Sequence, residues 1–181
     1  SPSGNWAPGG KSLFVGGDGK VYYEIGGVGR INGNIRVDND KWRYVALVSD
    51  GRKYKIYVDG KKDREGDLNV KADVKDSVGK IGFTSDNYPN PGGFTGRLDD
   101  VCIYNRALSE KEAGDAAVRG RRSRDGLVGC WMFEGSGRLD SSPKGNHSAS
   151  VVKTVPAGGG RKGRAIRVDK GKGALIIPRG R

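Results

Sequence analysis

The sequence contains few of the residues on which metal and nucleophile chemistry usually depends. Its 181 residues include two cysteines, one histidine and no glutamine. Cys102 and Cys130 belong to no CxxC or Cys/His spacing, so no zinc site is predicted. The single histidine, His147, excludes sites that need two imidazoles, and no GxSxG motif marks a serine nucleophile.

Long apolar runs and an excess of acidic residues are also absent. The longest apolar stretches, such as VALV at 45–48, are far shorter than the roughly 18 residues that a membrane-spanning helix requires, so we expect no membrane insertion. Lys and Arg number 33 against 21 Asp and Glu, a formal charge of +12. This charge favours polyanionic partners, although a solvated basic surface without a specific partner is an equal alternative.

Glycine, in contrast, is abundant at 32 positions, and it recurs in turn signals at short intervals. Between the turns, apolar and polar residues alternate in the segments 20–26, 41–49, 53–60, 80–85 and 97–105. A period of two between turn signals predicts antiparallel strands. In KYKIYVDG, for example, Tyr54, Ile56 and Val58 share one face, which we expect to be buried, and Lys55 and Tyr57 share the other.

One short helix is predicted within residues 107–118, where Ser109 precedes Glu112 in the spacing of a capping box. Residues 119–125, RGRRSRD, carry four arginines and no apolar residue, which indicates an exposed linker rather than a protease or polyanion site. The strand pattern then resumes to the end of the chain. The expected fold class is all-β, an antiparallel β-sandwich with one short helix.

Two stretches of the chain resemble laminin G-like, concanavalin A-like jelly-roll domains. WRYVALVSDGRKYKIYVDGK at 42–61 and GRLDDVCIYNRALSEKE at 96–112 are similar to the end of such a domain. GLVGCWMFEGSGRLDSSPKGNHSASVV at 126–152 and GRAIRVDKGKGALIIP at 163–178 are similar to its beginning. The resemblance implies a lectin-like sandwich whose two halves occur in circularly permuted order.

The permuted order divides the chain into three parts. Residues 1–118 form the half that usually ends the domain, 119–125 the arginine-rich linker, and 126–181 the half that usually begins it. The second half could complete the sandwich within its own chain, because termini of sandwiches lie at the surface and often close together. It could instead complete a neighbouring chain, which would produce a swapped or polymeric assembly.

The resemblance also implies that the first and last strands of the family are neighbours, here 126–134 beside 97–105. Alternation would then place Leu127, Gly129 and Trp131 on the core face and both cysteines on the outer face. On this interpretation Cys102 and Cys130 can form a disulfide across the two strands, and two free thiols are the alternative. Trp42, Trp131 and Phe133 are assigned to the core.

A calcium site is implied by the same resemblance. The loop 140–146 matches a family loop that holds the ion, and the acidic pair of the last strand supplies further oxygens; the expected ligands are Asp140, Asn146, Asp99 and Asp100. Pro143 and Lys144 depart from the family pattern, and Lys144 places a cation near the ion. The alternative is that Asp140 and Asn146 only shape a turn. We expect any calcium to be structural.

Catalysis is disfavoured, because glycosidases of this sandwich type use closely spaced carboxylates on one strand and the candidates at 65–73 and 98–100 lack that spacing. Sugar binding requires aromatic faces with polar groups around them. The candidates on strands and in the loop DNYPNPGGF are Trp6, Tyr23, Tyr57, Asp86, Asn87, Tyr88 and Asn90.

The function predicted from the sequence is a non-catalytic carbohydrate-binding module, for an acidic or sulfated polysaccharide, with a structural calcium ion. The family resemblance and the disulfide place the protein outside the cell or on its surface. The alternative is a self-assembling adhesive protein that exchanges sandwich halves. Binding to nucleic acid is disfavoured, because no motif that reads bases is present.

Overall fold

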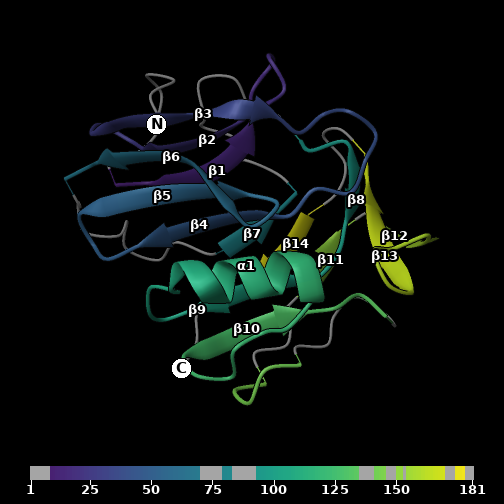
Figure 1. The fold of residues 1–181 in the computed structure, drawn as a ribbon. Coiled ribbons are helices and arrows are strands. Elements are labelled where there is room, and N and C mark those ends of the chain that lie inside the picture. Colours follow the sequence, from purple (N-terminus) through teal and green to yellow (C-terminus); the bar gives the residue numbers. More distant parts are fainter. Residues whose placement is uncertain are drawn as a thin grey trace. The chain divides into compact units, whose positions relative to one another are not determined.

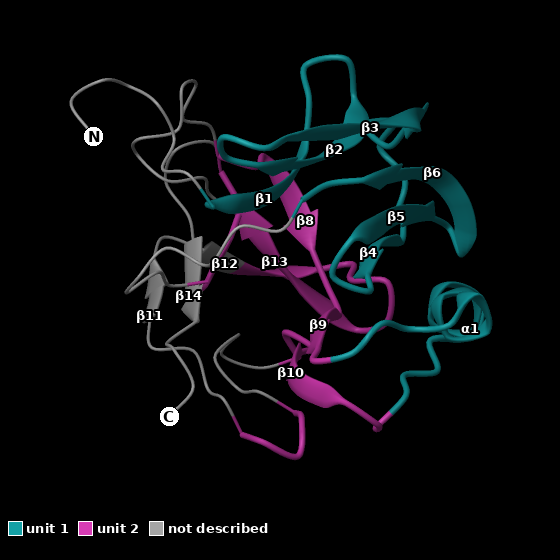
Figure 2. Cartoon of the chain, turned by 90° about the vertical axis from the view of Figure 1, so that its left-hand side faces the viewer, with its two compact units in different colours: residues 1, 6–74, 106–123 teal, residues 2–5, 75–105, 124–181 magenta. Residues whose placement is uncertain are grey.

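The computed structural model describes residues 9–69, 79–82, 93–134, 141–145, 150–152, 154–169 and 174–177. The chain forms two compact units (Figure 2). The first draws its described residues from 6–74 and 106–123, and the second draws its own from 75–105 and 124–181. Each unit therefore contains two separate segments of the chain.

The first unit contains two three-stranded antiparallel sheets made from consecutive hairpins (Figure 1). One sheet has the order β1-β2-β3, and the other has the order β4-β5-β6. Their bounds are β1 Lys11–Val15, β2 Lys20–Ile25, β3 Gly29–Arg36, β4 Val45–Ser49, β5 Lys53–Val58 and β6 Lys61–Asp67. The hairpin turns fall at the glycine-rich signals of the sequence, and Gly19 and Gly60 adopt positive φ there (77° and 81°).

The inward faces of the two sheets share one apolar core. Val21, Ile25 and Ile31 of the first sheet pack with Ile56 and Val58 of the second. Two tyrosines complete this core, because Tyr23 and Tyr54 stack with ring centroids 5.0 Å apart. Tyr23 is 5% exposed, so its prediction as an exposed sugar-binding residue is wrong: alternation along β2 directs Tyr23 inward and Tyr22 outward.

The helix α1, Glu110–Arg119, covers the other face of the second sheet. Ser109 caps the helix in a complete capping box with Glu112, as the sequence predicts, and Gly120 ends it in the left-handed conformation. Buried Ala113 packs against Val48 and Tyr57. Tyr57 is consequently 2% exposed, which corrects its prediction as an exposed ligand-binding residue, since the sheet is covered on both faces.

The second unit is assembled from strands that lie far apart in the sequence. Its pairs are β10 with β9, β11 with β14 with β7, and β12 with β13 with β8. The bounds are β7 Gly79–Ile81, β8 Gly96–Leu98, β9 Val101–Tyr104, β10 Leu127–Trp131, β11 Ser150–Val152, β12 Thr154–Gly158, β13 Arg164–Val168 and β14 Ala174–Ile177. Strands from before the arginine-rich segment thus pair with strands from after it, within a single chain.

The core of the second unit confirms two of the three predicted core aromatics. Trp131 and Phe133 are 1% and 3% exposed and pack with Ile166 and Val168. Trp42 is 40% exposed, so its assignment to the core is wrong. The reason is local: β4 begins at Val45, which leaves Trp42 in the connection that precedes the strand.

The pairing of β9 with β10 places Cys102 opposite Cys130, and the structure joins them in a disulfide. A β-bulge between Leu127 and Gly129 changes the alternation that the sequence predicts. Leu127 lies opposite Tyr104 and therefore shares a face with the cysteines, not with Trp131. The register keeps both cysteines on the face opposite Trp131 and Val101, which pack into the core, so the expected face is right, although Cys130 is only 2% exposed.

Candidate functional site

A surface pocket of about 190 Å³ lies between β3 and β6 in the first unit. Its walls are mostly polar and are formed by Arg30, Ile31, Asn32, Arg64, Glu65, Gly66, Asp67 and Leu68. The volume is below the roughly 300–1,000 Å³ of sites that enclose a whole small molecule. It therefore suits one sugar residue or one substituent, with the remainder of a larger ligand left in solvent.

The pocket exists because β3 and β6 approach each other as the edges of two different sheets. Asn34 joins the two strands: its backbone N–H donates to Asp63 Oδ2 at 2.8 Å and its side-chain amide donates to the Asp63 carbonyl at 2.9 Å. Further along, Gly66 permits close contact, since a Cβ there would lie 3.1 Å from the side chain of Ile31. The strands are thus held side by side, and exposed side chains from both strands line the pocket: Arg30 and Asn32 from β3, Arg64 and Asp67 from β6.

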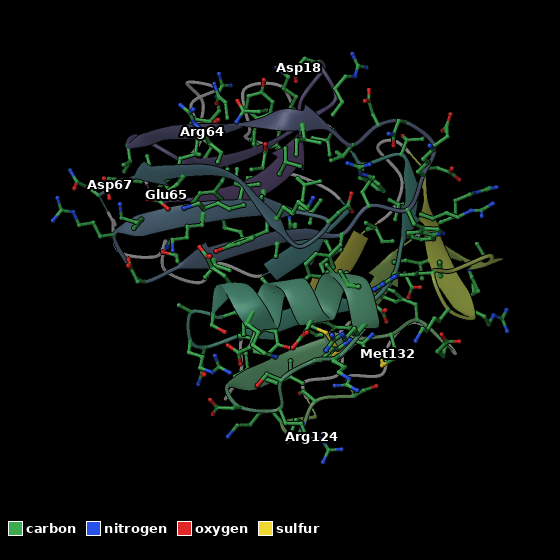
Figure 3. The ribbon with its side chains drawn as sticks, viewed as in Figure 1. Asp18, Arg64, Glu65, Asp67, Arg124 and Met132 are labelled. Atoms are coloured by element: carbon green, nitrogen blue, oxygen red, sulfur yellow. A yellow bond between two sulfur atoms is a disulfide. The ribbon has the colours of Figure 1, made fainter. Side chains whose placement is uncertain are left out.

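The carboxylates of the pocket are already bound to lysines. Lys53 and Lys62 donate to the two oxygens of Glu65 at 3.1 and 3.0 Å, and Lys53 also lies 3.9 Å from Asp67. The bond from Lys62, followed by that from Lys53, lowers the pKa of Glu65 and keeps it ionised at neutral pH. Figure 3 shows Arg64, Glu65 and Asp67 in order along β6.

An aromatic surface adjoins the pocket on the outer face of the first sheet. Tyr22 is half-buried, stacks on Phe14 at 5.5 Å, and donates its hydroxyl to Asp18 at 2.8 Å. This hydrogen bond raises the pKa of Tyr22 and lowers that of Asp18. The guanidinium of Arg30 lies 4.9 Å from the centre of the Tyr22 ring, so the aromatic surface and the pocket share this arginine.

This site was not among those predicted from the sequence, although the motif KVYYEIG contains its aromatic residue Tyr22. The predicted strand is right, but the tyrosine predicted to bind ligand, Tyr23, is buried, and its neighbour Tyr22 lies on the outer face. No sequence signal identified β3 or β6 as binding strands. Five other predicted ligand-binding residues lie outside the described residues: Trp6, Asp86, Asn87, Tyr88 and Asn90.

Two of the four predicted calcium ligands are described, Asp99 and Asp100, between β8 and β9. Asp99 Oδ2 accepts the backbone N–H of Arg161 at 2.8 Å, in the turn between β12 and β13. Its Oδ1 is buried and has no hydrogen-bond partner among the described residues. Burial, followed by the charge of Asp100, raises the pKa of Asp99.

A cation would suit the unpaired oxygen of Asp99, because a buried carboxylate oxygen without a partner is costly. Asp140 and Asn146, the other two predicted ligands, lie outside the described residues. Within the described ranges, no group of three or more His, Cys, Asp or Glu side chains is placed to hold a metal ion. None of the described helices is long and apolar enough to cross a membrane.

The sequence matches the laminin G-type family model of the concanavalin A-like lectin/glucanases superfamily over residues 3–114. The chain belongs to this superfamily, because the match covers more than half of its length. The predicted family and the predicted fold class, an antiparallel β-sandwich jelly roll with one short helix, are both confirmed. The match to the family does not extend to residues 126–181, so the similarity of this segment to the start of such a domain stays a prediction. No curated protein matches the chain.

Two solved structures are similar. One is a proposed carbohydrate binding protein from Bacteroides ovatus ATCC 8483, with a TM-score of 0.56 and 17% identity over 94% of this chain and 47% of that one. The chain thus spans about half of that protein, and the likeness concerns the fold alone. The other is an S-layer domain-containing protein from Clostridium thermocellum ATCC 27405, with a TM-score of 0.41 and 26% identity over 65% and 58% of the two chains.

Proposed function

We propose that the chain is a non-catalytic carbohydrate-binding module and that the pocket between β3 and β6 is its sugar site. The observation that carries this proposal is the union of a small polar pocket with an adjoining aromatic surface. Sugars are bound by polar groups that pair with hydroxyls and by aromatic faces that cover the apolar side of the ring. Membership of a superfamily of lectins and glucanases supports the same class of ligand.

The absence of catalysis is proposed from the state of the pocket carboxylates. A glycosidase requires one carboxylic acid that is protonated near neutral pH and a second carboxylate beside it. Glu65 is unsuited to the role of acid, because its two lysine contacts lower its pKa. Asp67 lies at the exposed rim, near Lys53.

Preference for an acidic or sulfated polysaccharide is proposed from charge. The pocket is lined by two arginines, Arg30 and Arg64, and two carboxylates, Glu65 and Asp67; Lys53 and Lys62, outside the lining, form ion pairs with these carboxylates. The chain as a whole, including these residues, carries a formal charge of +12, and this charge attracts polyanions over a longer range. The disulfide agrees with a location outside the cell or on its surface.

A polysaccharide panel tests the proposed site. Wild-type protein should be retarded in gels that contain at least one of dextran, alginate, polygalacturonate or dextran sulfate. Replacement of Asn32 by Ala should weaken that binding about 5-fold, because one hydrogen-bonding group is lost from the pocket. Tyr88→Ala is the matched control for the loop predicted from sequence. Loss of binding in Tyr88→Ala but not in Asn32→Ala would reject the pocket, and no retardation in any gel would reject the function.

We further propose that a structural calcium ion binds at Asp99, with Asp100, Asp140 and Asn146 as the remaining candidate ligands. The unpaired Oδ1 of Asp99 and its like-charged neighbour support this site. An ion there would neutralise both carboxylates and stabilise the β8–β9 connection. Calcium should raise the melting temperature of wild-type protein and leave that of Asp99→Asn unchanged; equal shifts in both proteins would refute the site.

A further inference from the structure

Two arginines of the pocket differ from the lysines around it, because neither forms an ion pair with a described residue. Arg30 on β3 and Arg64 on β6 are both exposed and line the same pocket from its two opposite strands. Within the described part of the chain, neither guanidinium forms a salt bridge, whereas Lys53 and Lys62 are both bound to Glu65. A guanidinium without an ion pair among the described residues can offer its N–H donors to an anion from solution.

Arg30 is also held in place before any ligand arrives. Its Nε donates to Asn32 Oδ1 at 2.9 Å, and its guanidinium lies over the Tyr22 ring. The hydrogen bond uses the Nε edge of the Arg30 guanidinium, and the tyrosine ring covers one of its two faces. The two Nη atoms make no hydrogen bond to a described residue. Because the side chain is already ordered, binding through the Nη atoms costs less conformational entropy than it would for a freely rotating side chain.

The acidic residues of the pocket do not cancel this attraction. Both oxygens of Glu65 are occupied by lysines, and Asp67 lies 3.9 Å from Lys53. The carboxylates that line the pocket are thus paired with lysines, and neither of them forms an ion pair with Arg30 or Arg64. An anion that enters the pocket would meet two guanidiniums with their hydrogen-bond donors available.

We propose that Arg30 and Arg64 together bind the oxyanion group, carboxylate or sulfate, of an acidic sugar residue, and so determine the specificity of the site for acidic polysaccharides. This proposal rests on the proposed carbohydrate-binding function and names its ligand class. The planar fork of arginine pairs with such a group through two parallel hydrogen bonds, which lysine cannot reproduce. The small volume of the pocket limits recognition to one sugar residue at a time.

The test measures binding of the full chain to alginate, polygalacturonate, dextran sulfate and neutral dextran by isothermal titration calorimetry at about 0.15 M salt, where exposed charges are strongly screened. Arg30→Ala and Arg64→Ala should each weaken binding to one of the acidic polymers about 10-fold. Arg64→Lys should recover less than half of that loss in free energy, because it restores the charge and not the fork. Arg121→Ala, which removes an exposed arginine outside the pocket, is the matched control and should change affinity less than about 2-fold.

The two kinds of polymer identify the oxyanion. Loss confined to alginate and polygalacturonate would identify a carboxylate, and loss confined to dextran sulfate a sulfate. Equal effects of Arg64→Ala and Arg121→Ala would show that binding depends on net charge. Full recovery of affinity in Arg64→Lys would show the same, and either result would overturn the proposed role of the arginine pair. If both alanine variants leave acidic-polymer binding unchanged, the pair is overturned while the carbohydrate-binding function stands. If wild-type protein binds none of the four polymers, the proposed function and the pair both fail.

Discussion

The two units of the chain build antiparallel sheets in different ways. In the first unit, each of the sheets β1-β2-β3 and β4-β5-β6 is a meander of consecutive strands. In the second, β8 pairs with β13 and β9 pairs with β10, so that partners come from opposite sides of the arginine-rich segment. The first unit is thus mainly local in sequence, and the second depends on closure of long loops.

Because its strands pair across long stretches of sequence, the second unit requires more additional stabilisation than the first. Loop closure costs entropy that grows slowly with loop length, and non-local pairing is slower to form than a hairpin. The disulfide between Cys102 and Cys130 lies in the second unit and joins two strands that no short turn connects. The first unit instead gains a helix on its second sheet, with the alanines of α1 packed against β4 and β5.

The two described tryptophans provide the largest contrast. Trp131→Ala should reduce the free energy of unfolding by about 4 kcal/mol, because it removes a large side chain that is 1% exposed in the core of the second unit. Trp42→Ala, at 40% exposure in the first unit, should cost less than about 1 kcal/mol. Urea unfolding followed by far-UV circular dichroism measures both, and similar losses would show that Trp42 is a core residue in solution.

Removal of the disulfide should have the next largest effect. A closed loop of 28 residues corresponds to about 3.5 kcal/mol of chain entropy in the unfolded state. Cys102→Ala/Cys130→Ala should lose about that amount, and hydrogen exchange should accelerate in β9 and β10 more than in β2 and β5. Uniform acceleration in all four strands would show that the units unfold as one and would remove the distinction between them.

Prediction of the fold from sequence succeeded where the pattern is local. The capping box at Ser109 and Glu112 predicts α1, and alternation predicts β2 and β5 almost to the residue. The pairing of β9 with β10 came only from the family resemblance, since nothing in the two segments alone specifies their partner. The bulge at Leu127 reverses the face of one residue, and alternation cannot reveal an inserted residue.

Prediction of the binding site failed for reasons that concern packing. A strand pattern cannot show that a helix will cover its polar face, which is why Tyr57 is buried under α1. In KVYYEIG, by contrast, Tyr23 shares the face of Val21 and Ile25 by simple alternation, so the sequence already indicates that Tyr23 faces inward, and its prediction as an exposed ligand-binding residue disregarded that pattern. The pocket itself requires β3 and β6, edges of two sheets, to approach each other, and this long-range arrangement has no signal in a single sequence.

The smallest effects concern two carboxylates whose pKa values move in opposite directions. In the first unit, Arg106, followed by the Ser109 backbone, lowers the pKa of Glu112. Its contribution is therefore present above the unfolded value near 4.5 and is lost as the pH falls through the folded pKa. In the second unit, burial raises the pKa of Asp99, so its contribution is present below the unfolded value near 3.8 and is lost as the pH rises through the folded pKa.

Calcium-free thermal unfolding between pH 3 and pH 7 separates the two carboxylates. Glu112→Gln should be destabilised by about 1 kcal/mol at pH 7, because a charge-assisted pair with Arg106 is lost, and should approach wild type as the pH falls. Asp99→Asn should be slightly more stable than wild type at pH 7, since the charge of a half-buried carboxylate whose Oδ1 has no described partner is removed, and should also approach it at low pH. Destabilisation of Asp99→Asn at pH 7 without calcium would mean that Asp99 Oδ1 has a partner in solution, and the proposed cation site would lose its main support.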